Sequence, residues 1–169
     1  MNPIVYQKLN SELLASSMIK GPITPANVES LIPRLNVNTL NDSALLYSGR
    51  SGDITARSLA EAYAKLTGKT TLEMTPGGRM LDGLYLYERP AFTDVQADAI
   101  WKSISARYAN AIRGDAEAIL INPSPTSIYL TTERVILTDP VSRTRVNLIE
   151  HSIDPRYPLV PEPVRTMKY

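Results

Sequence analysis

The stretch that decides the fold class runs from Thr93 to Asn122, TDVQADAIWKSISARYANAIRGDAEAILIN. Thr93 and Gln96 form a capping-box pair that predicts the start of a long helix, and Gly114 is expected to end it. The buried stripe of this helix is expected at Val95, Ile100, Ile104, Tyr108 and Ala111. The apolar run from Ala116 to Asn122 then predicts a buried strand. A long helix that leads directly into a buried strand is typical of an α/β domain.

Outward from this stretch, the same patterns predict two further strands and three further helices. An amphipathic helix is expected over residues 3–17, with its apolar side at Ile4, Val5, Leu9, Leu13 and Leu14. A short helix is expected over 25–31, capped by Thr24 with Pro25 in its first turn. A third helix should begin at Asp53 or Thr55 and stop at Gly68, with Ile54, Leu59, Tyr63 and Leu66 on one side. Strands are expected over 43–49 and 133–140.

This order of elements predicts a mostly parallel sheet flanked by helices, with a helical N-terminal part. Residues 1–42 are expected to be a helical segment packed on the domain, 43–152 the core, and 153–169 a proline-rich, extended tail. A chain of 169 residues is most simply one domain.

The composition excludes several classes of function. The net charge is +1 with acids and bases interspersed, so nucleic acid and anionic membranes are not expected partners. With no cysteine, the chain has no disulfide or thiolate chemistry, and its only histidine, His151, is expected in a solvated loop. The sequence shows neither a signal peptide nor an apolar run long enough to span a bilayer, which favours a chain that works in a reducing cytoplasm.

The stretch from Thr70 to Leu81, TTLEMTPGGRML, poses a question about its acid. It begins like a buried strand and turns over Pro-Gly-Gly, and Glu73 lies between two apolar residues. Simple alternation points Glu73 to solvent, whereas a ligand pocket would give the carboxylate a reason to face inward. In the same way, Trp101 is either a core residue or a pocket wall, and Glu133 either a solvated strand end or a functional acid.

Five short motifs together resemble the ADP-ribosyl cyclase and NAD glycohydrolase family in order and spacing. They are Leu46-Tyr47-Ser48, Thr71-Leu72-Glu73 with Gly78, Ile100 to Ala109, Ile119 to Asn122, and Ser127-Ile128-Tyr129 with Glu133. The resemblance covers roughly Leu45 to Leu137. It implies a cyclase-like α/β fold and NAD or NADP as the substrate, with no cofactor and no metal.

The resemblance also implies a role for each matching residue. Glu133 corresponds to the catalytic glutamate that stabilises the ribosyl cation, and Ser105 to a helix serine near the anomeric carbon. Glu73 corresponds to the acid that orients the carboxamide and favours hydrolysis over cyclisation. The implied substrate-binding residues are Trp101, Tyr47, Ser48, Asp82 and Tyr129. Arg50 and Arg79, each beside a glycine, are either pyrophosphate ligands or exposed solubilising residues.

The chain departs from the family pattern in four places. Animal members are disulfide-rich, whereas this chain has no cysteine. Tyr47 replaces a second tryptophan, Thr131-Thr132 replace a Gly-Ser pair, and Pro76 lies inside a segment that is usually helical. The ratio of cyclase to hydrolase activity therefore stays open.

A cysteine-free chain of this kind resembles the NAD-degrading domains of bacterial toxins and effectors. Such a domain would deplete NAD in the cytoplasm of a target cell and be restrained in its producer by an immunity protein. The alternatives are a cyclase that makes cyclic ADP-ribose, an enzyme acting on another N-riboside, a silent nucleotide-binding module and an interaction scaffold. Product analysis and thermal stabilisation by nucleotides distinguish them.

Overall fold

The computed structural model describes residues 2–154, 156 and 165–169. The chain forms two compact units, and each is built from two separate stretches. The first unit comprises Met1–Val37 and Leu72–Ile104, and the second comprises Asn38–Thr71 and Ser105–Tyr169. Helix α5 (Asp94–Ala111) belongs in part to each. The division of the chain into 1–42, 43–152 and 153–169 stays a prediction.

In the part of the first unit that the structure describes, all the regular elements are helices. Its elements are α1 (Pro3–Ile19), α2 (Pro25–Leu31), η1 (Ile32–Arg34), η2 (Leu72–Met74), α4 (Pro76–Asp82), η3 (Leu86–Glu88) and the start of α5. The predicted caps are confirmed. The Thr24 side chain accepts from the backbone amide of Asn27. In the capping box of α5, the amide of Thr93 donates to Oε1 of Gln96 at 3.0 Å, and the amide of Gln96 donates to Oγ1 of Thr93 at 3.2 Å.

Helix α1 exists as predicted, but its apolar side is not buried. The residues it buries are small, Ser11 and Ala15. A side chain added to Gly83, after α4, would lie 2.0 Å from the hydroxyl of Ser11, so α1 and the end of α4 approach closely through small residues. The predicted buried positions are 46–72% exposed: Ile4, Val5, Leu9, Leu13 and Leu14.

The expected strand and turn over residues 70–81 is wrong. Only Thr70 retains a strand contact, a parallel bridge to Ala44, and the chain then forms η2 and α4. Thr75 caps α4 by accepting from the amide of Gly78 at 3.1 Å, and Pro76 occupies the first helical turn. Thr-Pro-Gly-Gly is thus a helix start, because proline is well tolerated at that position, and Pro76 does not conflict with a helix.

The second unit contains a five-stranded sheet in the order β2-β1-β3-β4-β5. Its strands are β1 (Ala44–Ser51), β2 (Ile54–Thr55), β3 (Gly114–Ile121), β4 (Val146–Ser152) and β5 (Arg165–Lys168). β1, β3 and β4 are parallel, whereas β2 and β5 are antiparallel edge strands. The sheet is therefore mixed and not, as predicted, mostly parallel. The prediction lacked β4 and the two short edge strands β2 and β5, whose antiparallel pairing makes the sheet mixed.

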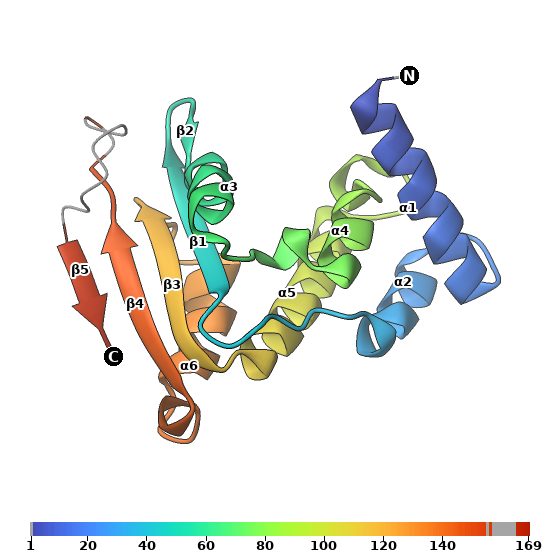
Figure 1. The fold of residues 1–169 in the computed structure, drawn as a ribbon. Coiled ribbons are helices and arrows are strands. Elements are labelled where there is room, and N and C mark those ends of the chain that lie inside the picture. The colour runs from blue at the N-terminus through green and yellow to red at the C-terminus, as the bar shows by residue number, and fades with distance from the viewer. Residues whose placement is uncertain (1, 155, 157–164) are drawn as a thin grey trace. The chain divides into compact units, whose positions relative to one another are not determined.

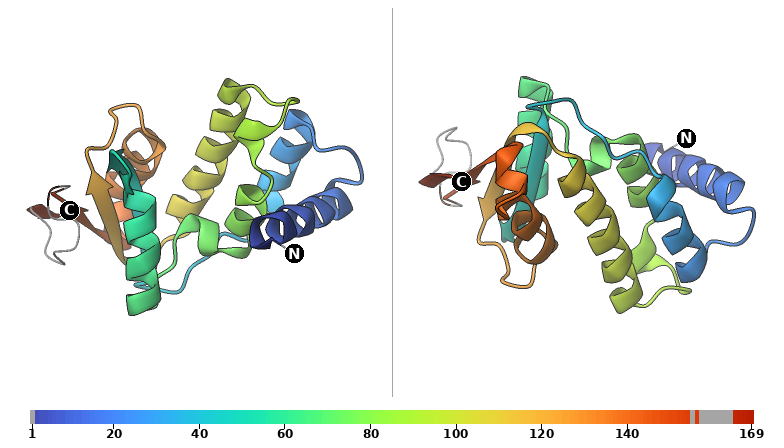
Figure 2. Two further views of the ribbon diagram at one scale, coloured as in Figure 1. Left: turned by 90° about the horizontal axis from the view of Figure 1, so that it is seen from above. Right: turned by 90° about the horizontal axis from the view of Figure 1, so that it is seen from below.

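Helices cover both faces of this sheet. One face carries α3 (Ala56–Thr67), and the other carries η4 (Tyr129–Glu133) and α6 (Arg134–Thr138), followed by η5 (Ser142–Thr144); Figures 1 and 2 show the two faces. Thr55 and Gly68 cap α3 as predicted. Of the predicted apolar side of α3, Leu66 is 86% exposed, whereas Ile54, Leu59 and Tyr63 are half-buried. The buried residues are Ala56, Ala60 and Ala64, whose small side chains let the helix lie close to the strands.

Two further predictions in the second unit are wrong. The predicted strand over 133–140 is absent. Glu133 ends η4, and Arg134–Thr138 forms the helix α6 despite its β-branched residues. His151 lies in β4 instead of a solvated loop. In the part of the chain that the structure describes, no helix has both the length and the apolar character needed to cross a bilayer.

Candidate active site

The candidate site lies at the carboxyl ends of β1 and β3, the edge where open α/β sheets bind ligands. Gly49 of β1 pairs with Ile121 of β3 and has a φ of 95°. A Cβ at this position would lie 1.8 Å from the carbonyl oxygen of Ile121, so only glycine allows the two strand ends to approach so closely. The preceding residue, Ser48, is 7% exposed.

The segment that carries Glu133 lies against β1. It is η4, a turn of π-helix, which is rare and occurs most often at functional sites. The Ser127 hydroxyl accepts from the amide of Leu130 at 3.3 Å and steadies the start of this turn. Glu133 is its last residue and is only 8% exposed. Glu133 is therefore a buried acid and not a solvated one.

A second buried acid, Glu150 of β4, lies beside this turn. Its Oε1 accepts from the hydroxyl of Tyr129 at 2.6 Å and from Nε of Arg134 at 2.8 Å. Its Oε2 accepts from the hydroxyl of Tyr169 at 3.1 Å. Burial, then the hydrogen bond to Glu150, raises the pKa of Tyr129 far above its usual value, so this hydroxyl stays protonated and donates.

Sequence analysis missed Glu150, although a signal was present. In VNLIEHS, residues 146–152, alternation places Val146, Leu148 and Glu150 on one face of the strand. Both apolar members of this face are buried, and so is Glu150. An acid on the buried face of a strand indicates a polar partner inside the protein.

The structure brings together part of the predicted site in the second unit. Ser48 faces the same side of the sheet as Glu150, because Ser48 is opposite Leu120, Leu120 is opposite Ser152, and alternate residues share a face. Tyr129 and Glu133 approach this face from η4. Tyr47, one residue before Ser48, points to the opposite face and is half-buried.

Two other predicted residues of this unit have different surroundings. Ser105, on α5, is 4% exposed. Arg50 is exposed, and its guanidinium donates twice to the carbonyl of Gly52, at 3.1 and 2.8 Å. Arg50 thus holds the turn between β1 and β2. A role for Arg50 toward pyrophosphate stays a prediction.

The remaining predicted residues belong to the first unit. Glu73 lies in η2 and Asp82 at the end of α4, and both are half-buried. These two elements pack together, and a Cβ on Gly78 would lie 1.8 Å from the carbonyl oxygen of Leu72. This approach explains the glycine that follows the Thr-Leu-Glu motif. Trp101, on α5, is half-buried, and Arg79, on α4, is exposed.

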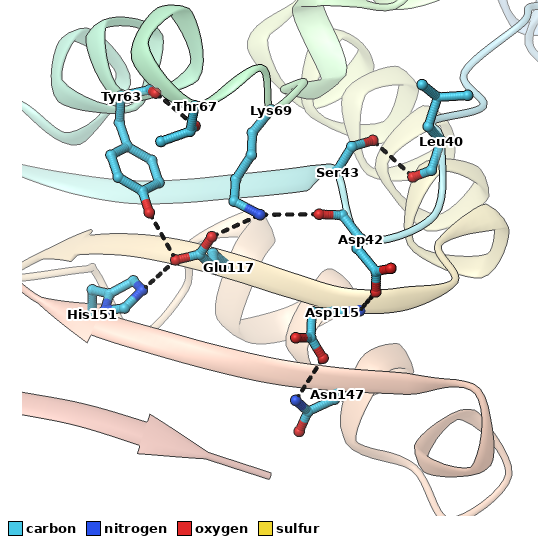
Figure 3. Close-up of polar contacts among 10 residues, drawn as sticks. All are labelled: Leu40, Asp42, Ser43, Tyr63, Thr67, Lys69, Asp115, Glu117, Asn147 and His151. Atoms are coloured by element: carbon cyan, nitrogen blue, oxygen red, sulfur yellow. Dashed lines mark hydrogen bonds and ion pairs between the residues drawn. The ribbon is translucent and has the colours of Figure 1, made fainter.

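A second polar cluster lies on the α3 face of the sheet and was also missed from the sequence (Figure 3). Its centre is Glu117 of β3, which accepts from the hydroxyl of Tyr63 at 3.0 Å and pairs with Lys69 and His151 at 2.8 Å each. Lys69 also donates to the backbone carbonyl of Asp42. Among the described residues, no group of three or more His, Asp or Glu is placed to hold a metal ion.

This cluster predicts a pH-dependent contribution to stability. Burial alone would raise the pKa of Glu117, but the hydrogen bonds from Lys69 and His151 outweigh it, so the pKa lies below its usual 4.5. The ionised form therefore stabilises the folded state above that value, and this contribution is lost as the pH falls through the folded-state pKa. Urea unfolding should show Glu117→Gln less stable than the wild type near neutral pH, with the difference shrinking in acid.

Glu61→Gln is the matched control, because the ion pair of Glu61 with Arg57 is 42% exposed on both sides. Its effect on the free energy of unfolding should be small at every pH. A difference for Glu117→Gln that stays constant from neutral to acidic pH would contradict the interpretation.

Comparison with known proteins gives a likeness of fold only. No family model matches the chain, and no curated protein matches it. Among solved structures, the chain is similar to one of CD38. That structure comes from a study of the catalytic mechanism of CD38 and of its covalent enzyme–substrate complex. The identity is 20% and the TM-score 0.49, over 65% of this chain and 52% of that chain. The chain thus spans about half the length of that protein, and a likeness at this level assigns no activity.

Proposed function

We propose that this chain is an NAD or NADP glycohydrolase, which cleaves the bond between nicotinamide and ribose and releases nicotinamide and ADP-ribose or its phosphate. The observation that carries the proposal is the buried carboxylate of Glu133, in a π-helical turn against the end of β1. The five sequence motifs that resemble the cyclase and glycohydrolase family support it, since Glu133 is where that pattern has its catalytic acid.

The chemistry requires a carboxylate more than any other group. Nicotinamide leaves from a pyridinium and takes the bonding electrons with it, so the ribose passes through a state like an oxocarbenium ion. A negative charge held against the developing cation lowers the barrier. Water then adds to the anomeric carbon and releases a proton, which completes hydrolysis. NAD is the substrate, and the proposal needs no further cofactor.

The resemblance implies roles for further residues within this proposal. Ser105 lies near the anomeric carbon, and Ser48 and Tyr129 stand among the substrate-binding residues beside the pocket. Glu73, Trp101 and Asp82 belong to the first unit, and their roles toward nicotinamide stay predictions from the resemblance. Tyr47 points to the face of the sheet opposite Ser48, so its predicted aromatic contact is not part of the proposal. Replacing Glu73 with glutamine should change the product mixture or the affinity for NAD, and unchanged products would remove Glu73 from the site.

Incubation with NAD and, separately, NADP, followed by chromatography of the products, tests the proposal. Nicotinamide with ADP-ribose supports hydrolysis. A cyclic product would replace the proposal with a signalling cyclase. No turnover, together with thermal stabilisation by NAD, would replace it with a silent nucleotide-binding module.

The biological role that we propose is that of a bacterial toxin or effector, which depletes NAD in the cytoplasm of a target cell. The absence of cysteine supports it, because folding then does not depend on an oxidising compartment. An immunity protein would protect the producer. Induced expression of the wild type should stop bacterial growth while Glu133→Gln does not, and equal growth of the two would contradict this role.

A further inference from the structure

The two sides of the turn that carries Glu133 are bound to one acid on a neighbouring strand. Tyr129, four residues before Glu133, and Arg134, the residue after it, both donate to Oε1 of Glu150. Glu150 is 6% exposed and belongs to β4, which is hydrogen-bonded on both sides within the sheet. A strand that is paired on both sides therefore anchors the π-helical turn.

Arg134 has further contacts that hold its charge in place. Its guanidinium donates to the hydroxyl of Tyr169 and lies 5.0 Å from the centre of the Tyr169 ring. Burial alone would lower the pKa of Arg134, but the hydrogen bond to Tyr169 and the charge of Glu150 raise it, so the guanidinium stays charged. Arg134 directly follows Glu133 in the chain, so its contacts with Glu150 and Tyr169 hold the end of the turn that carries Glu133.

We propose that Glu150 is a positioning residue for Glu133. It fixes the π-helical turn through Tyr129 at one end and Arg134 at the other, and so holds the carboxylate of Glu133 in place. The inference rests on the proposed function for its catalytic consequence. Its structural consequence, a turn held by Glu150, stands on the contacts alone.

Glu150→Gln is the informative variant because it keeps the size of the side chain and an acceptor but removes the charge. With Glu150 neutral, its ion pair with Arg134 is lost and the turn is held less firmly, and a small displacement of a catalytic group lowers turnover strongly. We expect kcat for NAD cleavage to fall about 10- to 100-fold while KM changes little. Tyr129→Phe, which removes one hydroxyl and keeps the ring, should lower kcat in the same direction but less.

Glu117→Gln is the matched control. Glu117 is also an acid of the central strands with a tyrosine and a cation as partners, but it faces α3 on the other side of the sheet. Its replacement should cost stability without lowering kcat. If Glu150→Gln lowers kcat no more than Glu117→Gln does, the positioning role is overturned.

Amide hydrogen exchange separates a failure of this inference from a failure of the proposed function. Residues 127–138 should exchange faster in Glu150→Gln than in the wild type or in Glu117→Gln, whether or not the protein cleaves NAD. Unchanged exchange in that segment would overturn the anchoring by Glu150. A wild type that fails to cleave NAD while the exchange result holds would overturn only the proposed reaction.

Discussion

Replacing Glu133 with glutamine should reduce the turnover of NAD by at least about 10²-fold. Glutamine has nearly the same shape as glutamate but no charge, so it cannot stabilise a developing ribosyl cation. Because the carboxylate acts mainly in the transition state, kcat should fall while KM for NAD stays close to its wild-type value. Steady-state kinetics of nicotinamide release measures both quantities.

The controls for this variant are its melting temperature, which reports on the fold, and the rise in that temperature when ADP-ribose binds. Glu133 is buried, but glutamine fits the same space, so the melting temperature should change little and ADP-ribose should still raise it. A variant that is folded, binds ADP-ribose and retains full kcat would contradict the role given to Glu133.

Replacing Gly49 with alanine should be the most destabilising of the single changes considered. The residue has a φ of 95°, and the new Cβ would lie 1.8 Å from the carbonyl oxygen of Ile121 and 2.9 Å from the nitrogen of Pro123. Backbone atoms in a parallel sheet cannot withdraw without breaking the strand pairing. We expect a loss of about 3 kcal/mol or more in the free energy of unfolding, measured by urea denaturation.

Gly52→Ala separates steric overlap from backbone preference. Gly52 also has a positive φ, 56°, but a Cβ there would meet nothing within 4 Å. Its replacement should cost about 1 kcal/mol, the usual penalty for a left-handed residue other than glycine. Equal losses for Gly49→Ala and Gly52→Ala would show that the close approach of β1 and β3 does not limit stability.

Local signals predicted the elements whose ends are set by capping chemistry. Thr24, Thr55, Thr93 and Gly68 all cap helices where the sequence places them, because a cap depends only on residues a few positions away. Strands with continuous apolar runs, β1 and β3, were also found. These features need no knowledge of the rest of the chain.

Elements that depend on distant partners were missed or misassigned. β5 forms only by pairing with β4, and the chain between these two strands gives no sign of that pairing. In α1 and α3, the longest apolar side chains do not mark the buried faces, because close approach to a neighbour selects alanine and serine. The β-branched content of residues 133–140 favours a strand, but the hydrogen bonds of a helix prevail there.

The residues of the candidate site divide in the same way, into those with a local signal and those that depend on distant partners. Glu133, Ser48 and Tyr129 belong to short motifs that can be recognised in order along the chain. Glu150 and Glu117 acquire meaning only through partners far away in sequence, such as Tyr129 for Glu150 and Lys69 for Glu117. An acid within the apolar pattern of a strand was the available signal for both.

The most direct test of the central claim is a time course of nicotinamide release from NAD by equal amounts of folded wild type and Glu133→Gln. The account predicts steady release of nicotinamide, matched by ADP-ribose, from the wild type, and release near the uncatalysed background from the variant. Equal release by the two proteins, or none by the wild type, would contradict it.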